Sequence, residues 1–241
     1  LQGPSSKGSA MSFNPETPKA AALNPMPPVV MALFLMIVGV EALFALASIG
    51  VLGEGFDASW RFFAIERYGI NTNLVSWMRK TQDYGAEHLV RFVTFSFLHA
   101  SFMQAAIACA LFLAMGKMVG SVFSAPAVLM FFFVSAALGA LVYCLIAPEA
   151  GWLFGAFPGI YGLIGAYTFL LWVSLKAQQA PAGKAFNMIA MLIGIQLVFG
   201  IFLSGRLLWI ADLAGFLGGF TLSVLLLPGG LARLMQALRR D

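Results

Sequence analysis

Apolar residues fall into long runs that short polar stretches separate. Six runs can be counted, at residues 29–53, 92–115, 122–147, 153–175, 186–204 and 207–227. Each approaches or exceeds the about 20 residues that a helix needs to cross the hydrocarbon core of a bilayer. Continuous apolar runs lack the alternating polarity of barrel strands, so helices are expected. The pattern therefore predicts an all-α integral membrane protein with a six-helix membrane domain over residues 29–227.

Composition agrees with this pattern. Hydrophobic residues make up 61% of the chain and charged residues 10%, whereas a typical soluble domain is about 25% charged. The net charge is only +4 and the basic residues are scattered among loops, which argues against nucleic acid as a partner. Cys109 and Cys144 both lie inside apolar runs, where we expect buried hydrophobic side chains rather than a disulfide or a metal site.

The two ends of the chain are polar. Residues 1–10 precede Met11 and resemble the remnant of an expression tag, so they do not enter the fold prediction. Residues 11–28 form a polar leader that lacks the layout of a signal peptide, and residues 228–241 form a basic tail suited to an anionic membrane surface. The count of lysines and arginines on the two sides, seven against six, favours cytoplasmic termini.

The first loop, residues 54–90, is too long for a simple connection and mixes aromatic with charged side chains. Such mixtures favour the headgroup region of a membrane. A structureless loop of this length would be unusual in a compact protein. Two short amphipathic pieces that lie in the membrane interface are therefore expected, near residues 57–67 and 73–82.

Small residues recur at helical spacing between residues 154 and 167. They are Gly155, Gly159, Gly162 and Ala166. Such a stripe leaves one helix face nearly bare, so that a neighbouring helix can approach closely. Pro158 lacks a backbone donor and is favoured in the first turn, so the helix is expected to begin there. Non-helical backbone before it must be buried in protein or line a cavity if it lies at membrane depth.

Three separated segments carry motifs. Residues 91–104 place Arg91 before a phenylalanine-rich stretch and His99 near the start of a helix. Residues 154–167 contain Tyr-Gly-Leu-Ile-Gly, and residues 211–219 contain two glycines four positions apart. In this order, with the long first loop, the segments resemble the rhomboid family of intramembrane serine proteases over roughly residues 54–220. The resemblance implies a six-helix rhomboid-like bundle of the bacterial type, in the bacterial inner membrane.

Positions that match the family's motifs are expected to serve packing and support. They are Arg91, His99, Gly155, Gly159, Tyr161, Gly162, Gly165, Gly215 and Gly219. His99 is interpreted as a brace for the long loop or the motif, because no cluster of metal-type ligands accompanies it. No cofactor motif is found in the chain.

Positions that carry chemistry in the family differ in this chain. By the resemblance, Phe157 stands at the nucleophilic serine and Asp212 at the general-base histidine. Gln104 and Ala108 stand at the histidine and asparagine of the oxyanion side. Serine hydrolysis needs a hydroxyl, a base within reach and donors aimed at the oxyanion. Loss of the nucleophile or base alone lowers the rate by several orders of magnitude, so the resemblance implies a pseudoprotease.

Two acidic residues lie inside apolar runs, Glu41 in the first and Asp212 in the last. A carboxylate at mid-membrane costs about 2.5–3.5 kcal/mol on insertion scales, so such groups tend to face the protein interior. Each is either protonated or hydrogen-bonded inside the fold, with burial raising its pKa, or it contacts a polar or basic membrane residue of a partner. A proton relay is a further alternative.

Three functions remain open, and the first is favoured. The chain binds transmembrane segments or larger membrane complexes without cleaving them, with Phe157, Asp212 and Glu41 as possible contact positions. Alternatively, it is an intramembrane peptidase with altered catalytic residues. The third possibility is a proton or solute pathway through Glu41 and Asp212, which the lack of an inverted repeat weakens.

Ser96 and Ser101 lie near His99 and provide hydroxyls for the altered peptidase. Serine near a helix start more often caps the helix or bonds locally, and this interpretation is preferred here.

Overall fold

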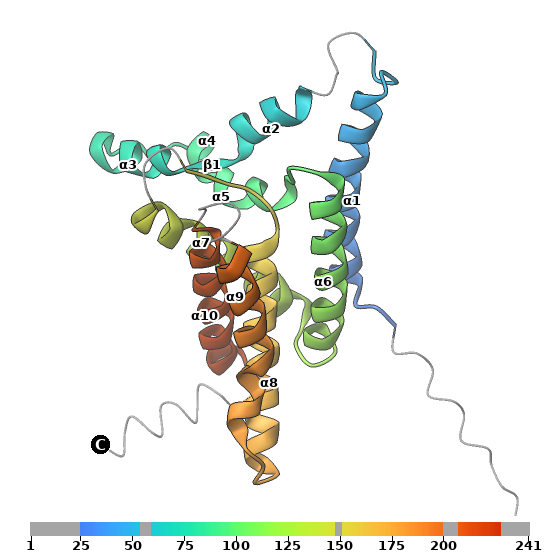
Figure 1. Cartoon of the computed structure of the whole chain (residues 1–241), viewed down its shortest axis with the longest axis vertical. Coiled ribbons are helices and arrows are strands. Elements are labelled where there is room, and N and C mark those ends of the chain that lie inside the picture. Colours follow the sequence, from blue (N-terminus) through green and yellow to red (C-terminus); the bar gives the residue numbers. More distant parts are fainter. Residues whose placement is uncertain (1–24, 54–58, 148–150, 200–206, 228–241) are drawn as a thin grey trace, which may run out of the picture.

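The computed structural model describes residues 25–53, 59–147, 151–199 and 207–227. Its α-helices are α1 (Pro28–Ser48), α2 (Trp60–Tyr68), α3 (Thr72–Thr81), α4 (Ala86–Leu89), α5 (Arg91–Thr94), α6 (Phe102–Gly120), α7 (Ala125–Ile146), α8 (Phe157–Ala177), α9 (Asn187–Phe199) and α10 (Leu208–Leu226). Two 3-10 turns, η1 (Phe95–Phe97) and η2 (Ala182–Phe186), and two short strands, β1 (Ile70–Asn71) and β2 (Trp152–Leu153), join them (Figure 1). The expected tag remnant, most of the expected leader and the expected basic tail lie outside the described residues.

Five of the described helices are long and apolar enough to cross a membrane, namely α1, α6, α7, α8 and α10. The chain is therefore an integral membrane protein, with five candidate spans in its described part where six were expected. Helix α9 takes the place of the expected span 186–204 and has 13 residues. At 1.5 Å per residue it is about 20 Å long, which is shorter than the about 30 Å of a hydrocarbon core.

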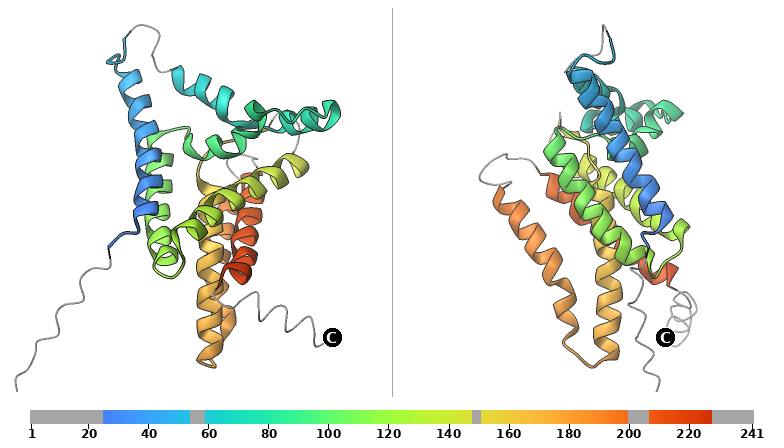
Figure 2. Two further views of the ribbon diagram at one scale, coloured as in Figure 1. Left: turned by 180° about the vertical axis from the view of Figure 1, so that it is seen from behind. Right: turned by 90° about the vertical axis from the view of Figure 1, so that its right-hand side faces the viewer.

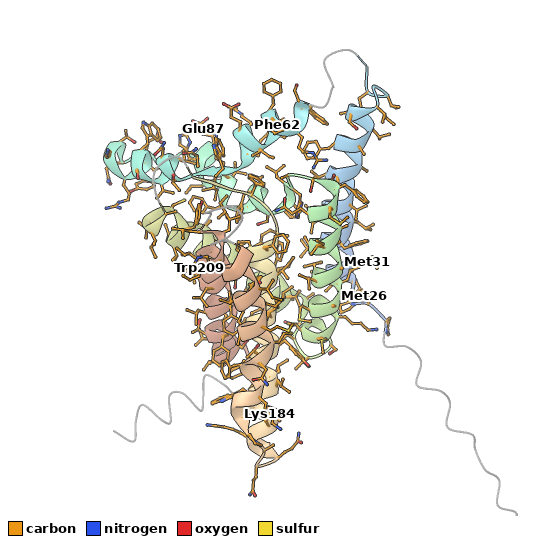
Figure 3. The ribbon with its side chains drawn as sticks, in the orientation of Figure 1. Met26, Met31, Phe62, Glu87, Lys184 and Trp209 are labelled. Carbon is orange, nitrogen blue, oxygen red and sulfur yellow. The ribbon has the colours of Figure 1, made fainter. Side chains whose placement is uncertain are left out.

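Helices α6, α7 and α10 pack against α8, and α1 packs against α6. The first residues of α1 and the last residues of α10 lie at the same end of the molecule (Figure 1). Helices α8 and α9 form a hairpin that extends beyond the neighbouring helices at this end (Figure 2). Lys184 marks the tip of the hairpin, whereas Phe62 and Glu87 of the first loop lie at the opposite end (Figure 3).

The apolar run 92–115 is not one continuous helix, contrary to expectation. Its first residues form α5 and η1, the backbone is extended at Leu98 and Ser101, and α6 begins only at Phe102. Phe95 and Phe97 are buried in the protein core. The start of this run is apolar because it packs inside the protein, not because it spans the membrane.

Within the first loop, α2 and α3 lie close to the two expected amphipathic pieces. The loop is fastened to the segment before α8, which the hydrophobic pattern did not indicate. Strand β1 pairs with β2 in antiparallel register, with Ile70 opposite Leu153. The N–H of Thr72 donates to the carbonyl of Gly151 at 2.9 Å, and the N–H of Gly151 donates to Oγ1 of Thr72 at 3.0 Å. The loop is thus part of the fold.

An ion pair ties the same loop to α1. Arg61 of α2 donates from Nη1 and Nη2 to the two carboxylate oxygens of Glu41 at 2.9 and 2.6 Å. Nη1 also donates to the carbonyl of His99 at 2.7 Å. The side chains of Arg61 and Glu41 are 17% and 9% exposed, and the guanidinium lies 4.7 Å from the centroid of the Phe44 ring. Glu41 therefore has a bidentate partner within the chain.

Helix α8 packs between α7 and α10 through glycines. A Cβ on Gly162 would lie 2.6 Å from the carbonyl oxygen of Phe131 on α7. A Cβ on Gly219 of α10 would overlap the carbonyl oxygen of Gly162, and one on Gly165 would overlap the carbonyl oxygen of Phe216. Because glycine has no Cβ, the three backbones come into direct contact.

Replacing Gly219 with alanine tests this packing. The added methyl group meets backbone that cannot rotate away, so we expect Gly219→Ala to lower the free energy of unfolding by about 1–3 kcal/mol, the cost of overpacking. Gly39→Ala is the matched control, because a Cβ on Gly39 meets nothing within 4 Å. Thermal unfolding in detergent measures both, and equal stability of the two variants would contradict the prediction.

Removing one partner of the ion pair tests how strongly the loop depends on it. Arg61→Gln leaves the buried carboxylate of Glu41 without its cation, and breaking a buried pair in this way costs about 3–5 kcal/mol. The double variant Glu41→Gln/Arg61→Gln is expected to be more stable than the sum of the single effects implies. Arg67→Gln, at an exposed position of the same helix, provides the control. Additive effects in an unfolding cycle would refute the coupling.

Candidate functional site

The candidate site lies where η1, α6 and the start of α8 meet. Gly155 has a φ of +112°, a conformation that side chains rarely tolerate, so glycine is needed here. Its N–H donates to the carbonyl of Phe95 at 2.8 Å. A Cβ on Gly155 would lie 3.5 Å from Nε2 of Gln104 and 3.6 Å from Cδ2 of Phe157. The same position is 3.8 Å from Cδ2 of His99, so three side chains converge on this glycine.

His99 connects two elements of the site. Its side chain is buried, and its Nε2 accepts a hydrogen bond from the N–H of Ala156 at 3.4 Å. Its carbonyl accepts the bond from Arg61 described above. Burial lowers the pKa of His99 to about 4, so the imidazole is neutral at pH 7. The residue braces both the first loop and the turn before α8.

Gln104 lies in the first turn of α6. Its Oε1 accepts a hydrogen bond from the N–H of Ala100 at 2.8 Å, which leaves the amide nitrogen on the side of Gly155. The hydroxyl of Ser101 caps the helix by accepting from the N–H of Gln104 at 3.2 Å. Ser101 therefore has the local capping role expected from its place in the sequence. Gln104 is partly exposed and keeps N–H donors beside Phe157.

Phe157 is the first residue of α8 and is half-buried against the main hydrophobic core. The phenyl ring has no atom able to act as a nucleophile. Tyr161 follows four residues later on the same face of the helix. Helix α8 begins one residue before Pro158, close to the expected start.

Asp212 lies on α10 and is 4% exposed. It is near enough to Tyr161 for the two groups to interact electrostatically. The backbone around it is tightly packed, because a Cβ on Gly139 of α7 would lie 2.5 Å from the carbonyl oxygen of Ala211. Asp212 thus lies on α10 near Tyr161 of α8, and Tyr161 is one helical turn after Phe157.

Ala108 and Arg91 have surroundings that indicate roles in packing and in support of the first loop. Ala108 is fully buried in the main hydrophobic core, one turn of α6 beyond Gln104. Arg91 donates from Nη1 to the carbonyls of Glu66 at 3.1 Å and Gly69 at 3.3 Å. These carbonyls lie at the C-terminal end of α2, where a cation satisfies groups that have no partner within the helix. Arg91 therefore shapes the first loop.

Arg61 is the supporting residue that the sequence reasoning missed. It sits in the first turn of α2, among the aromatic side chains Trp60, Phe62 and Phe63. Two sequence features could have indicated it: Arg61 is a cation in a segment expected at the membrane interface, and the preceding apolar run contains the acidic residue Glu41. Among the described residues, no group of three or more His, Cys, Asp or Glu side chains is placed to hold a metal ion.

Comparison with known protein families identifies the family of this chain. The Rhomboid domain matches residues 86–229, and a search of curated proteins found no match. The matched segment covers more than half of the chain. It includes Arg91, His99, Gln104, Phe157 and Asp212, which are the positions placed above around α6, α8 and α10. The chain belongs to the rhomboid family.

Proposed function

We propose that this protein is a rhomboid-like pseudoprotease that binds transmembrane segments of membrane proteins without cleaving them. The observation that carries the proposal is Phe157 at the start of α8, the position that resembles the family's nucleophilic serine. Its ring is in contact range of Gly155, beside Gln104 and the neutral His99. A ring in place of a hydroxyl removes the nucleophile, and Asp212 replaces the base histidine.

The described contacts disfavour a peptidase with substituted residues. Ser101 holds the N-terminus of α6 with its hydroxyl, and Ser96 is fully buried within η1. Ser101 is exposed but its hydroxyl is engaged in capping, and Ser96 is not accessible to a substrate. The contacts also disfavour a proton pathway through Glu41, because its carboxylate is bound bidentately by Arg61. Binding without cleavage is the function left with the strongest support.

Helix α6 offers a face for a client helix next to the site. Phe102, Met103 and Ile107 are 70%, 66% and 48% exposed. Gln104 lies beside the first two and carries N–H donors, and such an amide can bond across helices in a membrane. We propose that a client segment packs on this face and reaches Gln104 and Phe157 from it. Asp212 is a contact for a polar client residue only if the client enters deeply.

This proposal includes the expected membrane placement. Termini on one side of the membrane agree with the common end of α1 and α10, and the bacterial inner membrane is carried over from the family resemblance. In this arrangement α9 takes the part of the sixth crossing, between α8 and α10.

Absence of hydrolysis is the first expected result. The purified protein should show no labelling by a fluorophosphonate probe and no cleavage of a reporter transmembrane substrate. Phe157→Ser should not restore either, because Asp212, Gln104 and Ala108 remain unchanged. An active bacterial rhomboid protease in the same detergent is the positive control. Labelling of one serine, with cleavage lost in Asp212→Ala, would overturn the proposal in favour of an altered peptidase.

Site-specific crosslinking tests the client face. A photoreactive phenylalanine at Phe102 should capture membrane proteins from native membranes, identified by mass spectrometry. The same group at Leu145 of α7, which is 55% exposed, controls for capture by lipid-facing positions in general. We expect distinct adducts from Phe102 that are absent from Leu145. The same set of adducts from both positions would contradict a specific client face.

A further inference from the structure

A groove lies between the first loop and α7, away from the candidate site. It encloses about 480 Å³, within the about 300–1,000 Å³ of pockets that hold ligands. Its lining residues are Val75, Met78, Arg79, Tyr84, Leu89, Phe92, Val134, Ala137, Leu138 and Leu141. Helix α3 supplies one wall and α7 the opposite wall, with α3 crossing the end of α7 (Figure 1).

The α7 wall of the groove continues into the surface that faces lipid. Val134, Leu138 and Leu141 are 45%, 38% and 42% exposed on a helix apolar enough to span the membrane. Met78 and Val75 of α3, both buried, line the opposite wall. An acyl chain lying along α7 can therefore enter the groove without leaving an apolar environment.

The groove has one charged group. Arg79 lies in the last turn of α3 and is exposed. In the part of the chain that the structure describes, its guanidinium makes no hydrogen bond or ion pair. Tyr84, which is 50% exposed, adds a phenolic hydroxyl to the lining. A cation and a hydroxyl beside apolar walls match a ligand with an anionic head and a hydrocarbon chain.

We propose that this groove binds an anionic phospholipid, with one acyl chain between α3 and α7 and the phosphate on Arg79 and Tyr84. Arginine presents donors in a planar fork that fits phosphate oxygens. Helix α3 belongs to the first loop, whose mixed aromatic and charged residues favour headgroup depth. The single cation in the lining favours a ligand with an anionic head over a wholly apolar transmembrane segment.

Native mass spectrometry of the full chain in detergent, titrated with phosphatidylglycerol and phosphatidylcholine, tests the proposal. Phosphatidylglycerol should bind in preference, with one molecule retained. Arg79→Gln should lower its affinity roughly tenfold or more, as expected for a lost hydrogen bond to a charged group. Lys80→Gln is the matched control, because it removes the same charge from the next residue of α3, which does not line the groove.

A second variant addresses the apolar part of the groove. Ala137→Phe fills it from α7 and should also reduce phosphatidylglycerol binding, while thermal unfolding checks that each variant is folded. Arg79→Gln carries the test if Ala137→Phe does not fold, since Arg79 is exposed. Equal binding of the two lipids, or equal losses in Arg79→Gln and Lys80→Gln, would overturn the proposal. Occupation of the groove by a second copy of the chain, or by a peptide that phosphatidylglycerol does not displace, would also overturn the proposal.

Discussion

The non-helical backbone before α8 is the constraint on which the rest of the fold depends. In a membrane protein, peptide groups outside regular helices need partners from the protein itself. The N–H groups of Gly151, Gly155 and Ala156 are satisfied by Thr72, Phe95 and His99. Each partner comes from another segment, so the first loop and η1 must be in place before this turn is complete. The long first loop is therefore needed to satisfy the backbone hydrogen bonds of the segment before α8.

The sequence allowed five of the six expected apolar spans, the two helical pieces of the loop and the glycine face of α8 to be predicted, because each depends on spacing within one segment. It did not reveal the break at Leu98 to Ser101, since buried and lipid-facing phenylalanines look alike in a sequence. The bond between Thr72 and Gly151 joins residues 79 positions apart. Arg61 and Glu41 likewise belong to different elements. Such pairings depend on tertiary packing, which local periodicity does not encode.

The candidate site was predictable only where it resembles a family motif. Gly155, Gly162 and Gly219 were expected to matter for packing, and the structure gives each a specific contact or backbone conformation. The roles of His99 and Arg91 as braces follow from hydrogen bonds to backbone carbonyls and N–H groups. These residues maintain the architecture around Phe157 whether or not the site performs chemistry. Membership of the family therefore establishes the fold of this protein more firmly than its catalytic activity.

The glycine contacts between α8 and its neighbours have a mechanical consequence. Where side chains separate two helices, rotamer changes can absorb small displacements. Gly162 and Gly219 instead bring peptide groups together, so at these contacts no large side chain separates α8 from α7 or α10. For one of these helices to slide along another, its backbone would have to shift to the next set of glycine contacts. The three helices therefore move as a single rigid unit. Under the proposed function, a client segment is therefore accommodated by displacement at the edge of this unit.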